Sequence, residues 1–582
     1  MVQKLSNKDV AVILNEIGTF LELKGDNPFK VRAYYNSART IQRLPTDLSE
    51  LIESGELRKI KGIGDALAKK IVTIISTGSL PYYEDLKASI PSGLREMLRI
   101  PGLGAKKVHK LWKYLEIATL GELEYACNEN RLVTLEGFGL KTQEKVLEGI
   151  NFLKKYANRF LLSYALNEAN KIVSILESHS KVRKLSVAGS VRRKREIIKN
   201  IDIVADVDIK DRTEVLQFLS KSTYTDSTLF STNVPLIVNQ NHASIKSEIG
   251  INVDIYFASS EEYPFILRYY TGSKEHNQEL QKFAAKKGFH LSEKNLFHDN
   301  EEVSCSSEEE IYSALGLSYI PPELRENVDE IELAEKNKIQ NLITEKDVKG
   351  CFHNHSVYSD GRATISEMVD KSRELGFKYL GISDHSQSAF YANGLSIERV
   401  QEQWREINKL NEELDDFTIF KSIESDVLVN GNLDYHDDIL KKFDYVVASV
   451  HSHFKLSLEE QTARILKAIN HPSVKILGHP TGRLLLSRDS YKVDMEKIIS
   501  EAAKVNVAVE INSNPHRLDL DWRWGKLARE VNLKVAINPD AHSLEGLNYI
   551  IYGVFIARKA GIPKENILNT WKVNKLFEFF KS

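Results

Sequence analysis

Short apolar segments that end in histidine or aspartate recur through residues 350–582, and they limit the possible folds of this chain more than any other feature. Helical segments separate them. Apolar runs of this length between helices are typical of βα units, so we expect a parallel sheet, either open or closed into a barrel. Polar residues at the ends of such strands are where α/β barrels build their sites. Examples are KYLGISDHS, FTIFKSIESDV, DYVVASVHSH, VKILGHPT and KVAINPDAHS.

The polar residues of these segments are types that bind divalent metals. Residues i and i+2 of a strand share a face, so both members of His353-x-His355 or Asp540-x-His542 can reach one ion. Imidazole and carboxylate without thiolate suit Zn²⁺, Mn²⁺ or Fe²⁺. One such pair would be weak evidence, whereas a series at successive strand ends predicts a metal site. The other candidates are Asp360, His385, Glu424, His451, His453 and His479.

The formal net charge of −2 averages two unlike halves of the chain. Residues 1–200 hold 34 Lys/Arg and 22 Asp/Glu, and the remainder holds 45 and 59. Ten of the 16 histidines follow residue 350. A basic front and an acidic, histidine-rich back predict a site for a polyanion and a site for metals.

Cysteine usage and hydropathy indicate the compartment. Cys127, Cys305 and Cys351 are too few and too scattered for a disulfide framework or a cysteine zinc site, and this favours a reducing compartment. The N-terminus lacks the pattern of a signal peptide, and no run of about 18 apolar residues is present. We therefore expect a cytoplasmic protein without a membrane span.

Residues 1–155 read as helices and contain three similar Gly-x-Gly segments, at Gly62-Ile63-Gly64, Gly102-Leu103-Gly104 and Gly137-Phe138-Gly139. Two glycines permit a tight turn that brings bare N–H groups close to a phosphate, and the following helix adds its positive end. One such turn would be weak evidence, but three before lysine-bearing helices favour DNA-backbone binding over helical packing turns. The candidate DNA-binding residues are Gly62, Gly64, Gly102, Gly104 and Lys106.

A basic strand and turn, KVRKLSVAGSVRRKREIIKNIDIVADVD, holds seven basic residues and no acid between Lys181 and Arg195. A solvated basic turn is one interpretation. In another, the backbone and hydroxyl of Gly189-Ser190 hold a triphosphate beside Arg192 and Arg193. Downstream, Asn200 and Asp202 share a strand face. Asp254 lies in an apolar strand, NVDIY, where a charge is costly without a partner such as a metal.

The order Gly-Ser-x-Arg-Arg, then an N-x-D strand, then a Val-Asp strand resembles the family X DNA polymerases. YYTGSKEHN is similar to the segment that contacts the incoming nucleotide in that family, which implies Tyr270, Thr271, Gly272 and Asn277 as nucleotide-binding residues. The resemblance covers the whole chain and is to a bacterial or archaeal family X polymerase with a fused PHP domain. Through it, nine residues are implied as ligands of a trinuclear metal site: His353, His355, Asp360, His385, Glu424, His451, His479, Asp540 and His542.

The resemblance implies a multidomain fold. Its parts are a helical domain 1–90 with the first helix-hairpin-helix, a fingers-like helical domain 91–158 with the second and third, an α/β nucleotidyltransferase palm 159–260, a C-terminal polymerase subdomain or thumb 261–320, a linker 321–345, and a PHP barrel of (β/α)7 type 346–582.

The implied function is a DNA repair protein, in which a gap-filling DNA polymerase is fused to a metal-dependent 3′–5′ exonuclease. Gapped or primer–template DNA and dNTPs would be its partners, Mg²⁺ or Mn²⁺ would serve the palm, and the protein would be a monomer. Three alternatives remain open: a DNA-end nuclease with a degenerate polymerase region, a DNA-end binder without activity, and a small-molecule phosphatase.

The sequence departs from the family at one catalytic position. The family's strand carries two metal-binding aspartates, usually in Gly-Asp-x-Asp, whereas this chain has Lys199-Asn200-Ile201-Asp202. A neutral amide removes one charge from a site that must balance two Mg²⁺ ions. We therefore expect a weakened or lost polymerase activity that leaves the exonuclease the more robust. The altered Lys199 favours a natural replacement over an engineered one.

Three further positions carry weaker predictions. Lys70 matches a lyase nucleophile of the animal members, although a phosphate-contacting or solvated lysine is the more ordinary interpretation. His453 and Arg483 resemble substrate-side groups of the PHP site. Asp384 either orients a metal ligand or forms a hydrogen bond at a strand end.

Overall fold

The computed structural model describes residues 5–128, 132, 135–156, 159–222, 236–239, 241–247, 250–339, 341–486 and 488–581. The chain forms two compact units, Met1–Ala157 and Asn158–Ser582. None of the helices in these described residues is long and apolar enough to cross a membrane.

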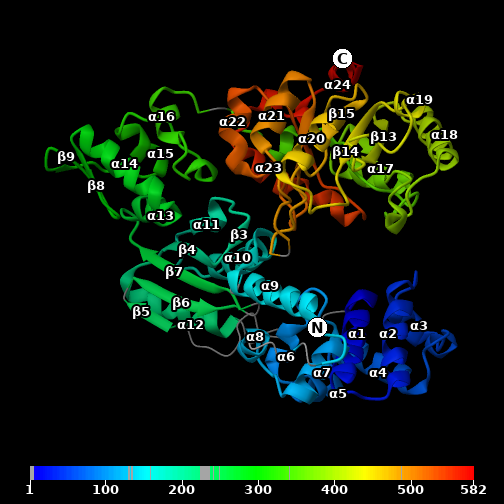
Figure 1. Ribbon diagram of the computed structural model, residues 1–582. Coiled ribbons are helices and arrows are strands. Elements are labelled where there is room, and N and C mark those ends of the chain that lie inside the picture. Colours follow the sequence, from blue (N-terminus) through cyan, green and yellow to red (C-terminus); the bar gives the residue numbers. More distant parts are fainter. Residues whose placement is uncertain are drawn as a thin grey trace. The chain divides into compact units, whose positions relative to one another are not determined.

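The described part of the first unit is built from helices (Figure 1). One hydrophobic core runs through it from Val10 to Ile150, so the predicted domains 1–90 and 91–158 share that core. Each predicted hairpin ends where a helix begins. The helices are α1 (Asn7–Leu23), α2 (Pro28–Gln42), α3 (Leu48–Glu53), α4 (Asp65–Thr77), α5 (Pro81–Ala88), α6 (Ser92–Met97), α7 (Ala105–Leu115), α8 (Leu120–Asn128) and α9 (Leu140–Tyr156).

The second unit begins with the palm, a five-stranded sheet in the order β2-β4-β7-β6-β5. Its strands β4 and β7 are parallel, and their register sets Asp202 opposite Asp254. The apolar strand NVDIY, predicted to carry Asp254, lies in β7. The elements are α10 (Leu162–Glu177), β2 (Lys184–Ala188), α11 (Gly189–Arg192), β4 (Asn200–Asp206), α12 (Arg212–Ser222), β5 (Leu236–Asn239), β6 (His242–Lys246) and β7 (Asn252–Ala258).

The thumb follows as two helices, a small sheet and a third helix. The segment expected as a linker, 321–345, also folds: it carries α16 (Glu330–Glu335), and Arg325 within it is fully buried. Arg325 Nη1 lies 2.6 Å from Glu308 Oε1, so this segment is anchored in the thumb. The thumb elements are α13 (Tyr263–Thr271), α14 (Lys274–Lys286), β8 (Phe289–Leu291), β9 (Leu296–His298), β10 (Glu301–Glu302) and α15 (Glu308–Ala314).

The last part of the unit is a nearly closed barrel of seven parallel strands in sequence order. The Phe352 N–H donates to Asn538 Oδ1 at 2.8 Å and joins the first strand to the last. Large rings, among them Tyr379 and Phe420, fill the interior beside α24 (Val573–Lys581). The strands are β11 (Gly350–Cys351), β12 (Tyr379–Ile382), β13 (Thr418–Asp426), β14 (Tyr445–Ser449), β15 (Val474–Leu477), β16 (Ala508–Asn512) and β17 (Val535–Asn538).

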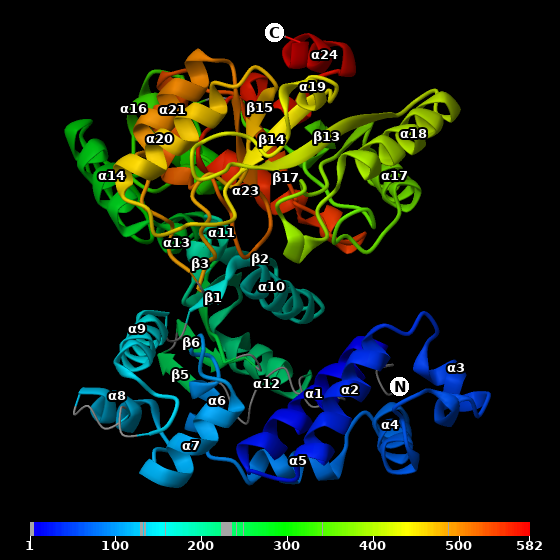
Figure 2. The same ribbon diagram turned by 45° about the vertical axis from the view of Figure 1, so that its right-hand side comes forward.

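Helices cover the outside of the barrel, and Figure 2 shows α20 and α21 beside β14 and β15. Strands buried on both faces explain the continuous apolar runs of the sequence. The expected (β/α)7 barrel is thus confirmed. The main helices are α17 (Ile365–Glu374), α18 (Ile397–Glu413), α20 (Leu458–Ile469), α21 (Met495–Lys504), α22 (Gly525–Glu530) and α23 (Ile550–Lys559).

Palm and barrel pack directly against each other within the second unit. Buried Glu196 of the palm accepts a hydrogen bond from the Trp522 indole at 3.0 Å. The Lys559 ammonium, also buried, donates to Glu326 Oε1 at 2.5 Å and to the Arg193 carbonyl at 2.9 Å. Because unpaired charges are costly to bury, these contacts fix the palm turn to the barrel.

Candidate metal centre and nucleotide cavity

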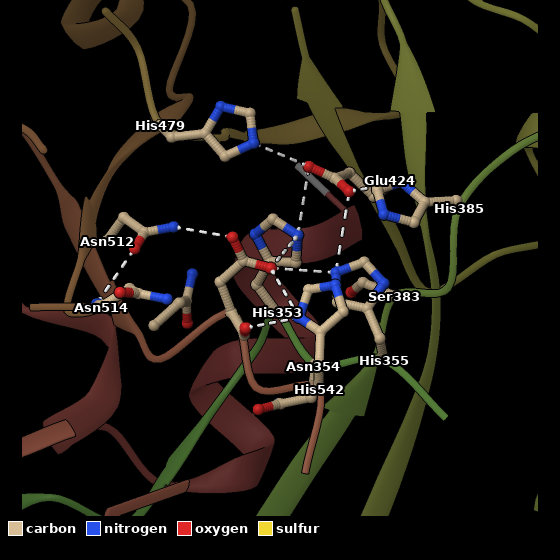
Figure 3. A network of polar contacts seen from close by, with 12 residues as sticks. His353, Asn354, His355, Ser383, His385, Glu424, His479, Asn512, Asn514 and His542 are labelled. Carbon is tan, nitrogen blue, oxygen red and sulfur yellow. Dashed lines mark hydrogen bonds and ion pairs between the residues drawn. The ribbon is translucent and has the colours of Figure 1, made fainter. Parts of the chain in front are cut away.

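The nine predicted metal ligands lie together at the carboxyl ends of the barrel strands. Figure 3 shows His353, His355, His385, Glu424, His479 and His542 among them. Possible ligand atoms lie within 4.8 Å of one another in three overlapping groups. His479 joins them through Glu424, since its Nε2 lies 3.0 Å from Glu424 Oε1. The groups are His355, Asp360, His385 and His542; His353, His355 and Asp540; and His385, Glu424 and His451.

Glu424, at the end of β13, occupies the middle of the cluster and is 1% exposed. Its Oε1 lies 3.2 Å from both His353 Nε2 and His451 Nε2, and its Oε2 lies 2.9 Å from His385 Nδ1. Burial alone would raise the pKa of Glu424, but the charges of His451, His353 and His385 hold this pKa well below its usual range. The carboxylate therefore remains charged.

Two buried ring nitrogens at the centre are free to bind an ion. His353 Nε2 and His355 Nδ1 are buried and have no hydrogen bond among the described residues. Burial, followed by the nearby His542 and His385, lowers the pKa of His355 to about 3, which keeps its ring neutral. Burial alone would lower the pKa of His451, but Glu424 and Asp426 raise it to about 10, so an ion that binds this ring would displace its proton. Imidazoles and carboxylates together are ligand types that suit divalent ions. The donor set therefore fits divalent metal ions.

Two carboxylates that sequence reasoning missed hold ligand histidines in place. Glu510 Oε2 lies 2.7 Å from His353 Nδ1, and Asp426 Oδ1 lies 2.5 Å from His451 Nδ1. Such partners orient the ring of a metal-binding histidine and raise its basicity. The signal that could have found Glu510 is a lone carboxylate inside the apolar strand VAVEIN.

The structure gives different surroundings to the three residues with weaker predictions around this centre. Asp384 accepts hydrogen bonds from Ser356 Oγ at 2.6 Å and Gln403 Nε2 at 2.6 Å, so it orders the loop that leads to Asp360. Arg483 pairs with Asp521 and donates to nearby backbone carbonyls, so it supports a loop. His453 is exposed.

The palm holds a cavity of about 460 Å³. Arg192, predicted as a nucleotide ligand, instead donates to Thr271 Oγ1 at 2.6 Å and pairs with Glu308, which ties the turn to the thumb. Six of the eight predicted nucleotide-binding residues line the cavity, together with two residues of the predicted catalytic strand: Gly189, Ser190, Arg193, Tyr270, Gly272, Asn277, Asn200 and Asp202.

Position 189 must be glycine because its backbone lies very close to the Asp202 side chain. Its φ is +58°, and a Cβ at this position would lie 1.9 Å from Asp202 Oδ2. A side chain here would push the carboxylate out of place and strain the backbone. The glycine therefore sets the backbone of the turn directly against the acidic group.

Asn200 bridges the two carboxylates of the palm. Its Nδ2 donates to Asp202 Oδ1 at 2.8 Å and to Asp254 Oδ2 at 3.2 Å. His242, which was not predicted, lies 3.1 Å from Asp254 Oδ1. Burial, and then the charge of Asp254, raises the pKa of Asp202 to about 7. The Asn200 amide thus donates hydrogen bonds that offset part of the negative charge of the two carboxylates. An aspartate at this position could not donate, and a cation would have to offset that charge instead.

The hairpin glycines of the first unit differ in whether the local backbone requires a glycine. Gly62 and Gly102 have φ of +95° and +82°, where other residues are strained. Gly64 and Gly104 have ordinary φ, and an added Cβ at either would meet nothing within 4 Å. The folded chain has room for a larger residue at these two positions, and each glycine is the N-cap of the helix that follows, where glycine is favoured over alanine.

Lys70 lies among tyrosines on α4. Its ammonium donates to the Tyr34 hydroxyl at 2.9 Å and lies 4.3 Å from the centre of the Tyr82 ring. A cation over an aromatic face is stabilised by the ring quadrupole. The side chain is therefore held in a defined position on the hairpin helix.

Family models match four parts of the chain. They are a helix-hairpin-helix domain at 5–80, a SAM-like helix-hairpin-helix tandem at 94–151, a DNA polymerase beta thumb at 266–326 and a PHP domain at 352–514. These matches fall on the first unit, the thumb and the barrel.

Similar proteins fall into two groups. The DNA polymerase/3′-5′ exonuclease PolX of Bacillus subtilis (strain 168) is 36% identical over 579 residues, which is 99% of this chain and 100% of that protein. Probable phosphatases match about two fifths of the chain. The one from Clostridium acetobutylicum is 28% identical over 244 residues, or 40% of this chain and 93% of that protein, and one from Thermoanaerobacter sp. (strain X514) is 29% identical over 246 residues.

Proposed function

On the premise that this chain belongs to the family X DNA polymerases with a PHP domain, we propose that it is a DNA repair enzyme whose 3′–5′ exonuclease is stronger than its nucleotide addition. The observation that carries the proposal is the contrast between its two acidic sites. The barrel holds all nine residues predicted as ligands close together, and some of their buried nitrogens make no hydrogen bond with the part of the chain that the structure describes. The palm has lost one carboxylate, at Asn200.

The barrel site would hold Mn²⁺, Zn²⁺ or Fe²⁺, in up to three positions. Bound ions of this kind activate water and stabilise the charge that develops on a phosphodiester. The nine side chains would fix the ions, and Glu510 and Asp426 hold His353 and His451 in the orientation for binding. Arg517, whose Nε lies 3.8 Å from Asp540 Oδ2, adds a positive charge beside the site that suits a phosphate substrate.

The palm cavity would bind a dNTP, with Gly189, Ser190 and Arg193 at the triphosphate and Mg²⁺ or Mn²⁺ at Asp202 and Asp254. The bond from Asn200 to Asp202 supports a weak activity, because an amide is a poor ligand for Mg²⁺ and already occupies a carboxylate oxygen. The open backbone at Gly64 and Gly104 supports hairpin contacts with the phosphates of gapped or primer–template DNA.

A labelled primer–template, incubated with and without dNTPs in Mg²⁺ or Mn²⁺, tests both halves. We expect 3′ degradation in Mn²⁺ and slow extension. Asp540→Asn should abolish degradation without affecting extension, and Asp254→Asn should do the reverse. Extension at rates typical of relatives with two aspartates would contradict the weakened palm. Retained degradation in Asp540→Asn would contradict the metal site.

A second candidate, a DNA-end nuclease whose polymerase region only binds DNA, is favoured by Asn200 itself. The same assay separates the two candidates, because a polymerase region that only binds DNA would not extend the primer in either Mg²⁺ or Mn²⁺. The match of part of the chain to probable phosphatases raises a third candidate, which is tested by comparing rates on primer DNA with rates on small phosphate esters.

The position of Lys70 supports a lyase role only if a sugar can reach its ammonium past Tyr34. Borohydride trapping on abasic DNA tests this. We expect Lys70→Ala to trap as well as the unchanged protein, because the ammonium is already engaged by two tyrosines; loss of trapping would assign Lys70 as the nucleophile.

A further inference from the structure

A groove of about 530 Å³ runs between α10 of the palm and α23 of the barrel domain, within the second unit. The described residues that line it include no aspartate or glutamate. This composition is unusual beside the acidic metal centre, and it favours an anionic and aromatic occupant. The lining residues that carry the argument are Tyr164, Lys194, His516, Tyr549, Tyr552 and Phe555.

Aromatic rings stand on both walls of the groove. Tyr164 on α10 exposes 54% of its surface, and Tyr549 just before α23 exposes 37%. Tyr552 and Phe555 pack against the palm core, which fixes the wall beneath them. Exposed rings on a rigid wall are the surfaces on which unpaired bases stack, and stacking needs no particular base.

Lys194 supplies a cation to the same groove. Its ammonium lies 4.3 Å from the centre of the Phe555 ring. Among the described residues, no carboxylate lies within ion-pair distance of it, although the other three basic residues of this turn, Arg192, Arg193 and Arg195, each pair with one. A cation left unpaired in an aromatic groove attracts a phosphate backbone.

The groove adjoins the metal centre through one short loop. His516, on the groove, is four residues from Asn512, whose amide donates to the metal-ligand position Asp540 at 3.1 Å. Four residues of extended chain span at most about 14 Å. That distance corresponds to about four stacked nucleotides at 3.4 Å each. Arg517, the next residue, already contacts Asp540.

We propose that this groove binds single-stranded DNA and directs its 3′ end to the metal centre. The inference rests on the proposed exonuclease function. Its occupant is single-stranded rather than duplex because base faces can reach Tyr164 and Tyr549 only when the bases are unpaired. Lys194 and His516 contact the backbone, and the rings hold the bases without reading their sequence.

Photocrosslinking tests the location without any catalysis. The full-length protein in EDTA is mixed with an oligothymidylate that carries 5-iododeoxyuridine near its 3′ end and is irradiated. We expect crosslinked peptides that contain Tyr164 or Tyr549. Crosslinks confined to other peptides would overturn the proposal, whether the competing site is the hairpin region or a surface elsewhere.

Kinetics test the role. The double variant Tyr164→Ala/Tyr549→Ala should raise KM for a single-stranded 3′ tail by about 10-fold or more, as expected for lost stacking. Tyr164→Phe/Tyr549→Phe keeps both rings and should behave as the unchanged protein. Hydrolysis of the p-nitrophenyl ester of thymidine 5′-monophosphate should not change in either variant. An unchanged KM in the alanine variant would refute the groove. Absence of hydrolysis by the unchanged protein on either substrate would refute the exonuclease, and the crosslinking result would still decide the groove.

Discussion

Asn200 Nδ2 donates a 2.8 Å hydrogen bond to Asp202 Oδ1, its neighbour on the same strand face. In a site with two aspartates, the charges of both carboxylates would need cations nearby. Here the Asn200 amide supplies a hydrogen-bond donor instead. We therefore expect the palm to keep its shape without metal and to add nucleotides slowly.

Asn200→Asp should increase Mg²⁺-dependent nucleotide addition, on the order of 100-fold, because it returns a charged ligand to the metal. Primer extension at saturating dNTP measures this. The same substitution combined with Asp254→Asn serves as the control and should remain inactive. An unchanged rate for the single variant would show that another feature of the palm limits catalysis.

Glu510→Gln should weaken metal binding at the barrel by about 10- to 100-fold, because the neutral side chain no longer orients His353 as strongly. Mn²⁺ titration with elemental analysis after dialysis measures the affinity directly. Asp444→Asn is a matched control: Asp444 accepts from the Lys421 N–H at 2.7 Å and lies just before β14, away from the strand ends that carry the ligands. Equal affinities in the two variants would contradict the role of Glu510.

Gly64→Ala should lower affinity for gapped DNA with little loss of folding stability. The new methyl group meets nothing in the protein, and its effect as a helix N-cap residue is below about 1 kcal/mol. Gly62→Ala should instead lower stability by about 1–2 kcal/mol, because φ there is +95°. Thermal unfolding and fluorescence anisotropy separate the two effects. Unchanged DNA binding in Gly64→Ala would remove this hairpin from the interface.

Glu308 should make the thumb acid-sensitive. Burial alone would raise its pKa, but Arg325 and Arg192 lower this pKa from 4.5 to about 2. Its contribution to stability is therefore present above pH 4.5 and is lost as pH falls from 4.5 toward 2. The shift corresponds to about 3 kcal/mol at pH 7.

Acid titration followed by circular dichroism tests this dependence in the unchanged protein and in Glu308→Gln. The variant should be less stable at pH 7 and should lose the pH dependence in that window. Glu309→Gln, an exposed neighbour on the same helix, is the control and should behave as the unchanged protein. Identical acid transitions in all three would contradict the pairing.

The barrel was predictable because its sequence pattern is local. The seven buried strands appear in the sequence as apolar runs, and most of the predicted ligands follow a strand by a few residues, as His385 follows β12 and Asp540 follows β17. The parallel arrangement then brings these ends together, so strand order alone places His353 near Asp540. The same reasoning applies to the facing positions of Asp202 and Asp254.

Other features depend on contacts between distant segments and leave no local signal. Glu510 resembles an ordinary strand residue until His353, 157 positions away, is placed beside it. Arg192 matches a nucleotide-binding motif, but Thr271 and Glu308 engage it in the folded chain. The segment 321–345 reads as a charged linker because its charges, such as Arg325, find partners only in the thumb.

Glu326 belongs to neither catalytic set, yet it pairs with Arg193 and Arg195 of the palm and with Lys559 of the barrel. If the chain were divided between palm and barrel, Glu326 would lose its ion pair with Lys559, and Glu196 would lose its hydrogen bond from Trp522. The surface of each half is therefore completed by contacts with the other, and we expect the palm to support the barrel whether or not it adds nucleotides.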